Sequence, residues 1–319
     1  MTIPPEEMFR ALGDGIRLRM LMLLRSGELT VGELALVLGQ SQPRISQHIK
    51  VLQEARLVER RKEGNSAFLS LGATPRVEPI FALLDSWALT GDEIAWFEAD
   101  KARLKAIHTD RAAEAQRFFE RNASRWHELR SLHVPDAEVD AAILNALGEH
   151  PLGRLLDIGT GTGHMLELLA PRAKTALGVD RSPEMLRFAR ERLASAGIDA
   201  RLRQADMYAL PMDDQSFDTI IMHQVLHYAQ HPEAVIAEAA RLLAPGGIFL
   251  IVDVAPHDHD DFRQRYAHAR LGFADKMVLR WLTAEHLTAS VVAHLAGDLT
   301  IAIWKGERAA ASGGLRVVR

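Results

Sequence analysis

The 319-residue sequence predicts an α+β domain followed by a larger α/β domain built on a parallel sheet. Three observations predict this fold class. Residues 1–75 show short helical patterns that end in a hairpin-like segment, whereas the chain from Gly153 onward alternates strand and helix patterns. The length also exceeds what one ordinary core supports. We therefore expect one domain over residues 1–75, a helical connector over 76–114 and a second domain over 115–319.

The composition excludes several classes of protein. The chain is 48% hydrophobic and 25% charged, as soluble globular proteins are. It has no cysteine, which excludes disulfides, thiolate metal sites and cysteine nucleophiles and suits the cytoplasm. The apolar run 248–252 is too short to cross a bilayer, and the start lacks a secretory pattern. We therefore expect a cytoplasmic protein without a membrane partner.

Charge is divided unevenly along the chain. Residues 1–75 carry ten Lys/Arg against eight Asp/Glu, whereas the remainder carries 28 against 34. A mildly basic first part and an acidic second part suggest different binding partners for each.

The first domain is expected to contain successive helices. Apolar residues recur on one helical face at Met8, Leu12, Ile16, Leu18, Leu21, Leu23 and Leu24. Thr30 followed by Glu33 is a capping-box signature for the next helix, which Gly39 ends. Ser41 then caps a further helix, with Pro43 early in its first turn.

The helix that starts at Ser41 is expected to read DNA. Ile45, Ile49 and Leu52 form its inward face. Its other side and flanks carry polar or basic residues, namely Gln42, Arg44, Ser46, Gln47, His48 and Lys50. Amide, guanidinium and hydroxyl groups on a short exposed helix are what reading base edges in a major groove requires.

A basic hairpin should follow this helix. Residues 57–71 predict two short strands around the turn Gly64-Asn65. Arg60, Arg61 and Lys62 would lie on this hairpin and suit contacts with DNA phosphates. The alternative is a solvated amphipathic helix followed by an ordinary hairpin.

Residues 9–21, 28–34 and 41–52 together resemble the ArsR/SmtB family of bacterial repressors, over about residues 6–72. The resemblance implies a homodimeric winged helix-turn-helix that binds a double-stranded DNA operator and is relieved by a ligand. Many members sense metals through cysteines near the position of Thr30 and Gly32. Because this sequence has none, thiolate sensing is excluded and we expect no metal site. A His or carboxylate site between Asp85 and His108 is the alternative.

The connector predicts packing helices. An apolar cluster suited to a dimerisation helix consists of Ile80, Phe81, Leu83, Leu84 and Trp87. A second stripe, expected to pack onto the next domain, consists of Phe118, Phe119, Trp126, Leu129 and Leu132. The alternative for this stripe is a lid over the ligand pocket, with Trp126, Arg130 and His133 at the entrance.

A glycine-rich loop follows the first strand of the second domain. Residues 155–158 predict a buried strand, and Gly159, Gly161 and Gly163 predict a sharp turn before a helix. The spacing is G-x-G-x-G, whereas a dinucleotide fold has G-x-G-x-x-G. Asp157 beside the loop would repel a pyrophosphate but can orient a cation. S-adenosylmethionine has an ammonium, a sulfonium and no phosphate.

Acids at the ends of later strands extend this pattern. Asp180 ends a second strand, where it can accept both ribose hydroxyls, and Asp206 ends a third, where it can accept the adenine amino group beside Met207. Residues 216–223 and the end of 242–253 predict two more strands. The expected cofactor-binding residues are Asp157, Gly159, Thr160, Gly161, Gly163, Asp180, Arg181, Met185, Asp206, Met207 and His223.

In this order the segments resemble class I S-adenosylmethionine-dependent methyltransferases of the small-molecule type, over about residues 115–305. The resemblance implies a Rossmann-like α/β domain with a seven-stranded sheet. It also implies an antiparallel final strand, which residues 299–304 can supply.

Candidates for catalysis cluster after the fourth strand. A methyl transfer needs an in-line nucleophile and often a base, and His223, His227 and Tyr228 are the expected catalytic residues. The alternative for each is a structural or surface role. The chain lacks the Asn/Asp-Pro-Pro-Tyr/Phe tetrad of amide and adenine-amine methylation. Residues 256–262 hold two His and three Asp, which we expect to form a solvated loop, with a metal site as the alternative.

The two parts together resemble ArsR-type regulators fused to a methyltransferase domain, a likeness extended by residues 119–135 and 267–273. That group is often linked to methionine-cycle genes. The resemblance therefore implies a regulator that senses S-adenosylmethionine or S-adenosylhomocysteine. The alternative is an active small-molecule methyltransferase that regulates its own gene. The residues leave open whether methyl transfer occurs, which acceptor is used and which operator is bound.

Overall fold

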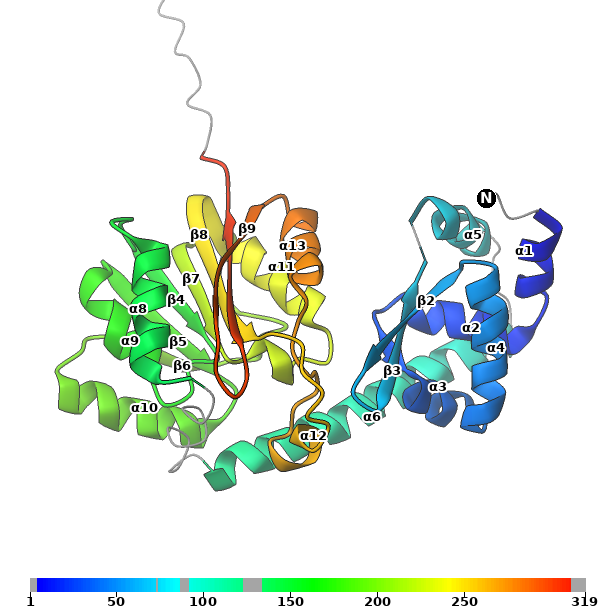
Figure 1. The fold of residues 1–319 in the computed structure, drawn as a ribbon, viewed down its shortest axis with the longest axis horizontal. Coiled ribbons are helices and arrows are strands. Elements are labelled where there is room, and N and C mark those ends of the chain that lie inside the picture. Colours follow the sequence, from blue (N-terminus) through cyan, green and yellow to red (C-terminus); the bar gives the residue numbers. More distant parts are fainter. Residues whose placement is uncertain (1–4, 73, 87–91, 123–133, 311–319) are drawn as a thin grey trace, which may run out of the picture. The chain divides into compact units, whose positions relative to one another are not determined.

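A computed structural model describes residues 5–72, 74–86, 92–122 and 134–310 (Figure 1). The chain divides into two compact units, residues 1–113 (unit 1) and 114–319 (unit 2). Within the described ranges no helix is both long and apolar enough to cross a membrane. The finer predicted division into residues 1–75, 76–114 and 115–319 stays a prediction.

Unit 1 combines helices with a small sheet. Its elements are α1 (Pro5–Leu12), α2 (Gly15–Leu24), β1 (Leu29–Thr30), α3 (Val31–Leu38), α4 (Gln42–Glu54), β2 (Val58–Glu63), β3 (Ser66–Leu71), α5 (Thr74–Ser86) and α6 (Asp92–Asn122). The three strands lie in the order β1-β3-β2, with β2 and β3 antiparallel as a hairpin. The last helix, α6, continues beyond residue 113.

The predicted helix boundaries of unit 1 have the expected local causes. Thr30 and Glu33 form a reciprocal capping box at the start of α3, and Gly39 ends that helix in the left-handed conformation. Ser41 occupies the N-cap position of α4, and Pro43 lies in its first turn. The predicted N-cap position of Ser41 is confirmed, although its side chain makes no capping hydrogen bond there.

One apolar core holds unit 1 together. Ile45, Ile49 and Leu52 of α4 are buried in it, which confirms the predicted inward face. Ile80 and Phe81 of α5 also pack into this core rather than facing outward. They are therefore not a free dimerisation surface, although Leu83 on the same helix is 43% exposed. Trp87 lies outside the described residues.

Unit 2 alternates strands and helices. Its elements are α8 (Asp136–Leu147), β4 (Arg154–Ile158), α9 (His164–Leu169), η2 (Ala170–Arg172), β5 (Thr175–Asp180), α10 (Pro183–Ala196), β6 (Arg201–Gln204), β7 (Phe217–His223), η3 (Leu226–Tyr228), α11 (Pro232–Leu242), β8 (Leu243–Val254), α12 (Phe262–Arg265), α13 (Asp275–Ala284), β9 (Thr288–Leu295) and β10 (Ile301–Glu307).

The described strands of unit 2 form the predicted seven-stranded sheet, in the order β6-β5-β4-β7-β8-β10-β9. The strands from β6 to β8 are parallel, and β10 runs antiparallel to both of its neighbours. The antiparallel strand predicted near residues 299–304 is therefore present. It lies inside the sheet, because β9 occupies the edge beside it.

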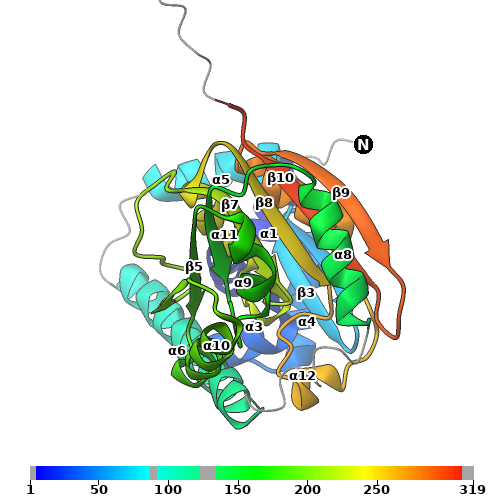
Figure 2. The same cartoon turned by 90° about the vertical axis from the view of Figure 1, so that its left-hand side faces the viewer.

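Helices cover both faces of this sheet (Figures 1 and 2). Successive strand residues point to opposite faces. Leu156 and Ile158 of β4 accordingly join the core beneath α11 and α13, whereas Leu155 joins the core beneath α8, α9 and α10. Because both faces are covered by helices, the sheet leaves the ends of its strands as the place for polar chemistry.

Candidate functional site

The carboxyl ends of the parallel strands carry the candidate site of unit 2. In an open α/β sheet, ligands bind in the crevice beyond these ends. The loop after β4 and the segment after β7 meet there. A Cβ atom on Gly159 would collide with the side chain of Val225, so these two loops are in direct contact. Residues placed after neighbouring strands are thus gathered at one edge.

The glycine loop is fastened to β5. The backbone N–H groups of Gly159 and Thr160 both donate to the carbonyl of Val179, at 2.8 and 2.9 Å. The N–H of Gly161 donates to the Asp180 carboxylate at 2.9 Å. Gly159, Gly161 and Gly163 all have positive φ angles, of 72°, 53° and 84°, as the sharp turn requires.

The hydrogen bonds of the glycine loop indicate which kind of ligand the loop can bind. A phosphate-binding loop turns its N–H groups toward the ligand. Here the N–H groups of Gly159, Thr160 and Gly161 are directed to β5 instead. Asp157, which is 1% exposed, adds a carboxylate directly before the loop. The loop therefore fits a cationic ligand without phosphate, as S-adenosylmethionine is.

Asp180 supports both the loop and the following helix. Besides Gly161, its carboxylate accepts the backbone N–H of Ser182 at 2.8 Å. Burial raises the pKa of Asp180, and the backbone donors act against this. Three backbone N–H groups, of Gly161, Arg181 and Ser182, bond this carboxylate, which leaves a lone pair that can accept a ribose hydroxyl while it holds the loop. Next to it, Arg181 is exposed and Met185 is buried in α10.

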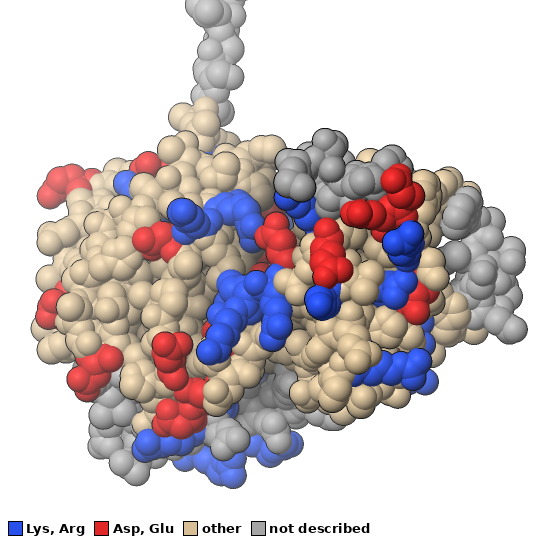
Figure 3. Space-filling view, turned by 45° about the vertical axis from the view of Figure 1, so that its right-hand side comes forward, with Lys and Arg blue, Asp and Glu red and all other residues tan. Residues whose placement is uncertain are grey.

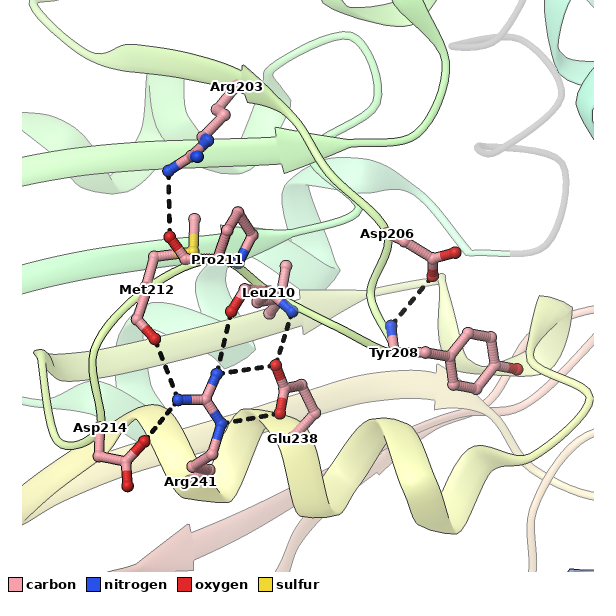
Figure 4. Close-up of polar contacts among 9 residues, drawn as sticks. All are labelled: Arg203, Asp206, Tyr208, Leu210, Pro211, Met212, Asp214, Glu238 and Arg241. Carbon is pink, nitrogen blue, oxygen red and sulfur yellow. Dashed lines mark hydrogen bonds and ion pairs between the residues drawn. The ribbon is translucent and has the colours of Figure 1, made fainter.

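The segment after β6 carries the predicted adenine contacts. Asp206 is exposed, and its carboxylate accepts the backbone N–H of Tyr208 at 3.0 Å (Figure 4). Met207 is partly buried and packs against the main core. The Tyr208 hydroxyl accepts the N–H groups of Gln230 and His231, just before α11. One end of the segment is thereby tied to the start of that helix.

Arg241 of α11 fastens the other end of the same segment (Figure 4). Its guanidinium donates to the carbonyls of Leu210 and Met212, each at 3.0 Å, and to Asp214 at 2.5 Å. Glu238, one turn earlier, pairs with Arg241 and accepts the N–H of Leu210 at 2.6 Å. Hydrogen bonding to Arg241 lowers the pKa of Glu238. We call these two residues the α11 clamp.

His223 ends β7 and is 8% exposed. Its ring centroid lies 6.3 Å from that of His164, the first residue after the glycine loop. His164 itself lies 2.9 Å from Asp140 of α8 and 3.2 Å from Arg192 of α10. The predicted cofactor residue His223 thus lies near His164, the residue that follows the glycine loop.

His227 forms a buried pair with Asp253, at the end of β8. The Nδ1 atom of His227 lies 2.6 Å from Oδ1 of Asp253. The same carboxylate accepts the backbone N–H groups of His227, at 3.2 Å, and of Val254, at 2.7 Å. Their side chains are only 5% and 1% exposed. The Nε2 atom of His227 is buried without a hydrogen-bond partner.

Two further rings pack on His227. The centroid of Tyr228 lies 4.0 Å from that of His227, and the centroid of His268 lies 4.2 Å away. Burial and the nearby Asp253 charge raise the pKa of Tyr228, so its hydroxyl stays protonated. The structure thus brings two of the predicted catalytic residues together with Asp253 and His268, which sequence reasoning missed.

The α4 face of unit 1 is mostly open to solvent. Its exposed members are Gln42, Arg44, Ser46, Gln47 and Lys50. His48 differs, because it is half-buried and its Nδ1 atom lies 3.7 Å from Asp14, the N-cap residue of α2. His48 is therefore directed to its own unit, and this geometry does not favour the predicted base contact.

The hairpin shows a similar division. Arg60 and Lys62 are both exposed to solvent, whereas Arg61 between them is half-buried. Arg61 pairs with Glu28 at 3.0 Å and Glu63 at 2.6 Å, and lies over the ring of Phe68. Two carboxylates already neutralise this guanidinium, so the geometry does not favour the predicted phosphate contact of Arg61. On the face seen in Figure 3, basic side chains occur in groups with acidic ones among them.

The His- and Asp-rich segment after β8 has no metal-binding geometry. The rings of His257 and His259 lie 5.6 Å apart, and both pack near Phe262. Across the described ranges, no group of three or more His, Asp or Glu side chains could hold a metal ion. The predicted lid residues Trp126, Arg130 and His133 lie outside the described residues.

Comparison with known families matches both units. Residues 14–60 match the family described as "Bacterial regulatory protein, arsR family", and residues 156–251 match the family described as "Methyltransferase domain". The chain therefore joins an arsR-type helix-turn-helix to a methyltransferase domain. Both predicted resemblances are confirmed. The cofactor of the methyltransferase domain is S-adenosylmethionine, which the glycine loop fits.

Several curated methyltransferases are similar to part of the chain. The chain is similar to phosphatidylethanolamine N-methyltransferase of Cereibacter sphaeroides, with 38% identity over 35% of this chain and 54% of the relative. It is similar to demethylmenaquinone methyltransferase of Thermus thermophilus, with 37% identity over 32% and 48%. It is also similar to ubiquinone biosynthesis O-methyltransferase of Paracidovorax citrulli, with 33% identity over 42% and 58%. The chain spans about half the length of these relatives.

Among solved structures, the chain is similar to the YcgJ protein of Bacillus subtilis, with a TM-score of 0.50 and 21% sequence identity. The match covers 55% of this chain and all of YcgJ. At this level of identity the likeness concerns the fold alone.

Proposed function

We propose that the chain is a DNA-binding transcriptional regulator whose DNA affinity responds to S-adenosylmethionine or S-adenosylhomocysteine. The observation that carries this proposal is the combination, on one chain, of an exposed polar and basic α4 face with a glycine loop whose N–H groups are turned away from the ligand. The first suits a double-stranded DNA operator, and the second suits a cationic cofactor. A ligand-responsive regulator needs both sites.

We divide the roles among the predicted DNA-binding residues according to their exposure. Base and phosphate contacts are assigned to the residues on the open side of α4 and the hairpin, which are Gln42, Arg44, Ser46, Gln47, Lys50, Arg60 and Lys62. His48 and Arg61 are assigned to packing within unit 1, because each is directed to acidic neighbours there. We assign cofactor binding to the remaining predicted residues of unit 2, and their positions at or after the ends of β4, β5, β6 and β7 support this assignment.

The proposed DNA-bound form is a homodimer in the cytoplasm. The three most exposed large apolar side chains among the described residues, Phe9, Leu36 and Leu83, all lie in unit 1. A contact between two copies that buried these side chains would remove apolar surface from water. A two-fold arrangement would present two α4 helices to an operator with matching symmetry.

The test is a DNA-binding titration with the full chain and DNA from upstream of its own gene. Operator affinity should differ about 5–150-fold between the protein alone and the protein with S-adenosylmethionine or S-adenosylhomocysteine. Asp180→Ala should bind DNA but lose this response. Arg44→Ala should lose affinity in every condition, whereas Lys101→Ala, an exposed control on α6, should not. Equal DNA affinity of the wild type in all three conditions would refute the proposal.

A second candidate function is methyl transfer to a small molecule. The observation that favours it is the buried pair of His227 and Asp253, because a regulator that only binds its cofactor has no need of an oriented imidazole. The relatives named above are methyltransferases by name, which agrees with this candidate.

A further inference from the structure

We propose that His227 is the general base of a methyl transfer and that its acceptor is the hydroxyl group of a phenol-type small molecule. This proposal rests on the second candidate function and adds to it a base, a positioning residue, Asp253, and a class of substrate. Its support comes from the hydrogen bonding of the pair, its place in the sheet and the chemistry of possible acceptors.

The hydrogen bonding of Asp253 sets the state of the imidazole. Its carboxylate accepts the backbone N–H groups of His227 and Val254, so both of its oxygens act as hydrogen-bond acceptors. The Nδ1 atom of His227, 2.6 Å away, must then donate its proton to Asp253. This hydrogen bond selects the tautomer with the lone pair on Nε2, which is the arrangement of an oriented base.

The Nε2 atom is buried without a partner in the structure. An unsatisfied buried polar atom costs free energy, and such atoms in native proteins call for an explanation, of which a catalytic role is one. The backbone near the pair is also strained. Gln224 lies three residues before His227, and Ala267 directly precedes His268. Their φ angles are 53° and 57°, in the left-handed region that non-glycine residues rarely adopt.

The position of the pair relative to the glycine loop suits transfer. The strand β7 lies between β4 and β8, so the segment that carries His227 is flanked by the glycine loop on one side and by Asp253 on the other. Val225, two residues before His227, touches Gly159 of that loop. A cofactor held by the loop and by Asp180 would therefore have His227 on the β7 side of its reactive end.

The chemistry of the base favours a hydroxyl acceptor. A thiol ionises more readily than a phenol, and an amine loses its proton before it attacks, so both depend less on a base during transfer. A phenol is a weaker acid, and its attack is assisted when a neutral imidazole removes the proton. The rings of Tyr228 and His268 pack on the ring of His227, and an aromatic setting of this kind suits a planar acceptor. Tyr228 stays protonated and does not compete as a base.

In the proposed step, the acceptor hydroxyl gives its proton to Nε2 of His227 while the oxygen lone pair attacks the methyl carbon. The bond between that carbon and sulfur breaks, and its electron pair stays on sulfur. The products are a methyl ether, S-adenosylhomocysteine and an imidazolium held by Asp253. The imidazolium then returns its proton to water.

The experiment measures S-adenosylhomocysteine release by the full chain with phenol, 2-naphthol and 4-nitrophenol, and with thiophenol and aniline for comparison. The assay pH is set where 4-nitrophenol is ionised and the other two phenols are not. His227→Gln should lower kcat/KM for phenol and 2-naphthol by about 10²–10⁴-fold, but by less than about tenfold for 4-nitrophenol, which needs no base. His294→Gln removes an exposed His near Asp275 and should leave kcat/KM unchanged for all three phenols.

Asp253→Asn provides the test of positioning. The amide introduced by this substitution would donate to Nδ1 of His227 and place the ring proton on Nε2. We therefore expect kcat/KM to fall for phenol and 2-naphthol but to change little for 4-nitrophenol. A merely structural role would lower the rates with all three phenols equally. Release with thiophenol or aniline but with no phenol, or no release with any phenol while calorimetry shows normal S-adenosylmethionine binding, would overturn the proposal. Neither result alters the DNA-binding test of the first function.

Discussion

At the residue scale, Gly159 decides whether the glycine loop can close. It has a φ of 72°, and a Cβ atom there would collide with Val225. Gly197, which ends α10, has a similar φ of 67°, but a Cβ atom at that position would lie in open space. Gly159 is therefore required both for its backbone conformation and for its close approach to Val225, whereas Gly197 is required for its backbone conformation alone.

Gly159→Ala should abolish or strongly weaken cofactor binding, because the collision displaces either the loop or the segment that leads to His227. Gly197→Ala should cost only the left-handed conformation, about 1–2 kcal/mol, and should leave binding intact. Calorimetric titration with S-adenosylmethionine, with a denaturation curve for each variant, makes the comparison. Equal affinities of the two variants would show that the contact with Val225 does not matter.

The site residues differ in how far the sequence could predict them. Glycines and strand-end acids follow local patterns, so Gly159, Gly161 and Asp180 could be placed at the carboxyl edge from the sequence. Asp253 also ends an apolar strand, as Asp180 does, and that signal could have found it. His268 carries no such signal, because its contact with His227 depends on how a distant segment crosses the end of β8.

At the element scale, α11 holds the segment that follows β6 at two points. Tyr208 is bound at the start of the helix, and the α11 clamp of Glu238 and Arg241 holds residues 210–214 further along it. The sequence showed neither point, because the partners are about 20–30 residues apart and their pairing depends on the packed sheet. Helix boundaries of unit 1, by contrast, were predictable because capping is local.

Glu238→Gln should reveal the clamp through pH. Arg241 lowers the pKa of Glu238 in the folded state. The ion pair therefore stabilises the folded state fully at pH values above the ordinary carboxyl range, and this stabilisation is lost as the pH falls through the folded-state pKa of Glu238. The variant should be less stable by about 1–2 kcal/mol at pH 7, and the difference should shrink below about pH 4. Urea unfolding across this range measures it.

Glu184→Gln on α10 is the matched control, because Glu184 pairs with Arg187 on the same helix but is exposed to solvent. Its effect on stability should be small at every pH, since exposed pairs contribute little. A Glu238→Gln variant with a pH-independent deficit would contradict the role assigned to its charge.

At the scale of the whole molecule, the sequence predicted the class of each part correctly, since each has its own periodicity. It did not predict β9, the edge strand, whose alternating half-buried pattern resembles many surface segments. Within unit 1, Arg19 binds the fully buried Asp100 of α6 through two hydrogen bonds of 2.7 Å, and Leu104 of α6 joins the core. The first part of α6 is thus firmly held in unit 1.

Reciprocity gives a quantitative check on the proposed regulation. If S-adenosylmethionine changes operator affinity by some factor, operator DNA must change S-adenosylmethionine affinity by the same factor. Titrations in both directions, with wild type and with Asp180→Ala, measure the two factors. One titration could show that the cofactor alters DNA binding while the converse titration shows that operator DNA leaves cofactor affinity unchanged. That result would point to a second cofactor site.

The interior position of β10 has a consequence for synthesis of the chain. Ile301–Trp304 are fully buried between β8 and β9, so the sheet of unit 2 lacks an inner strand until about residue 307 has been made. Unit 1, with its own core, is complete by residue 113. At about 5–20 residues per second, the first unit can fold roughly 10–40 s before the second. A newborn chain would acquire its helix-turn-helix before it could hold a cofactor.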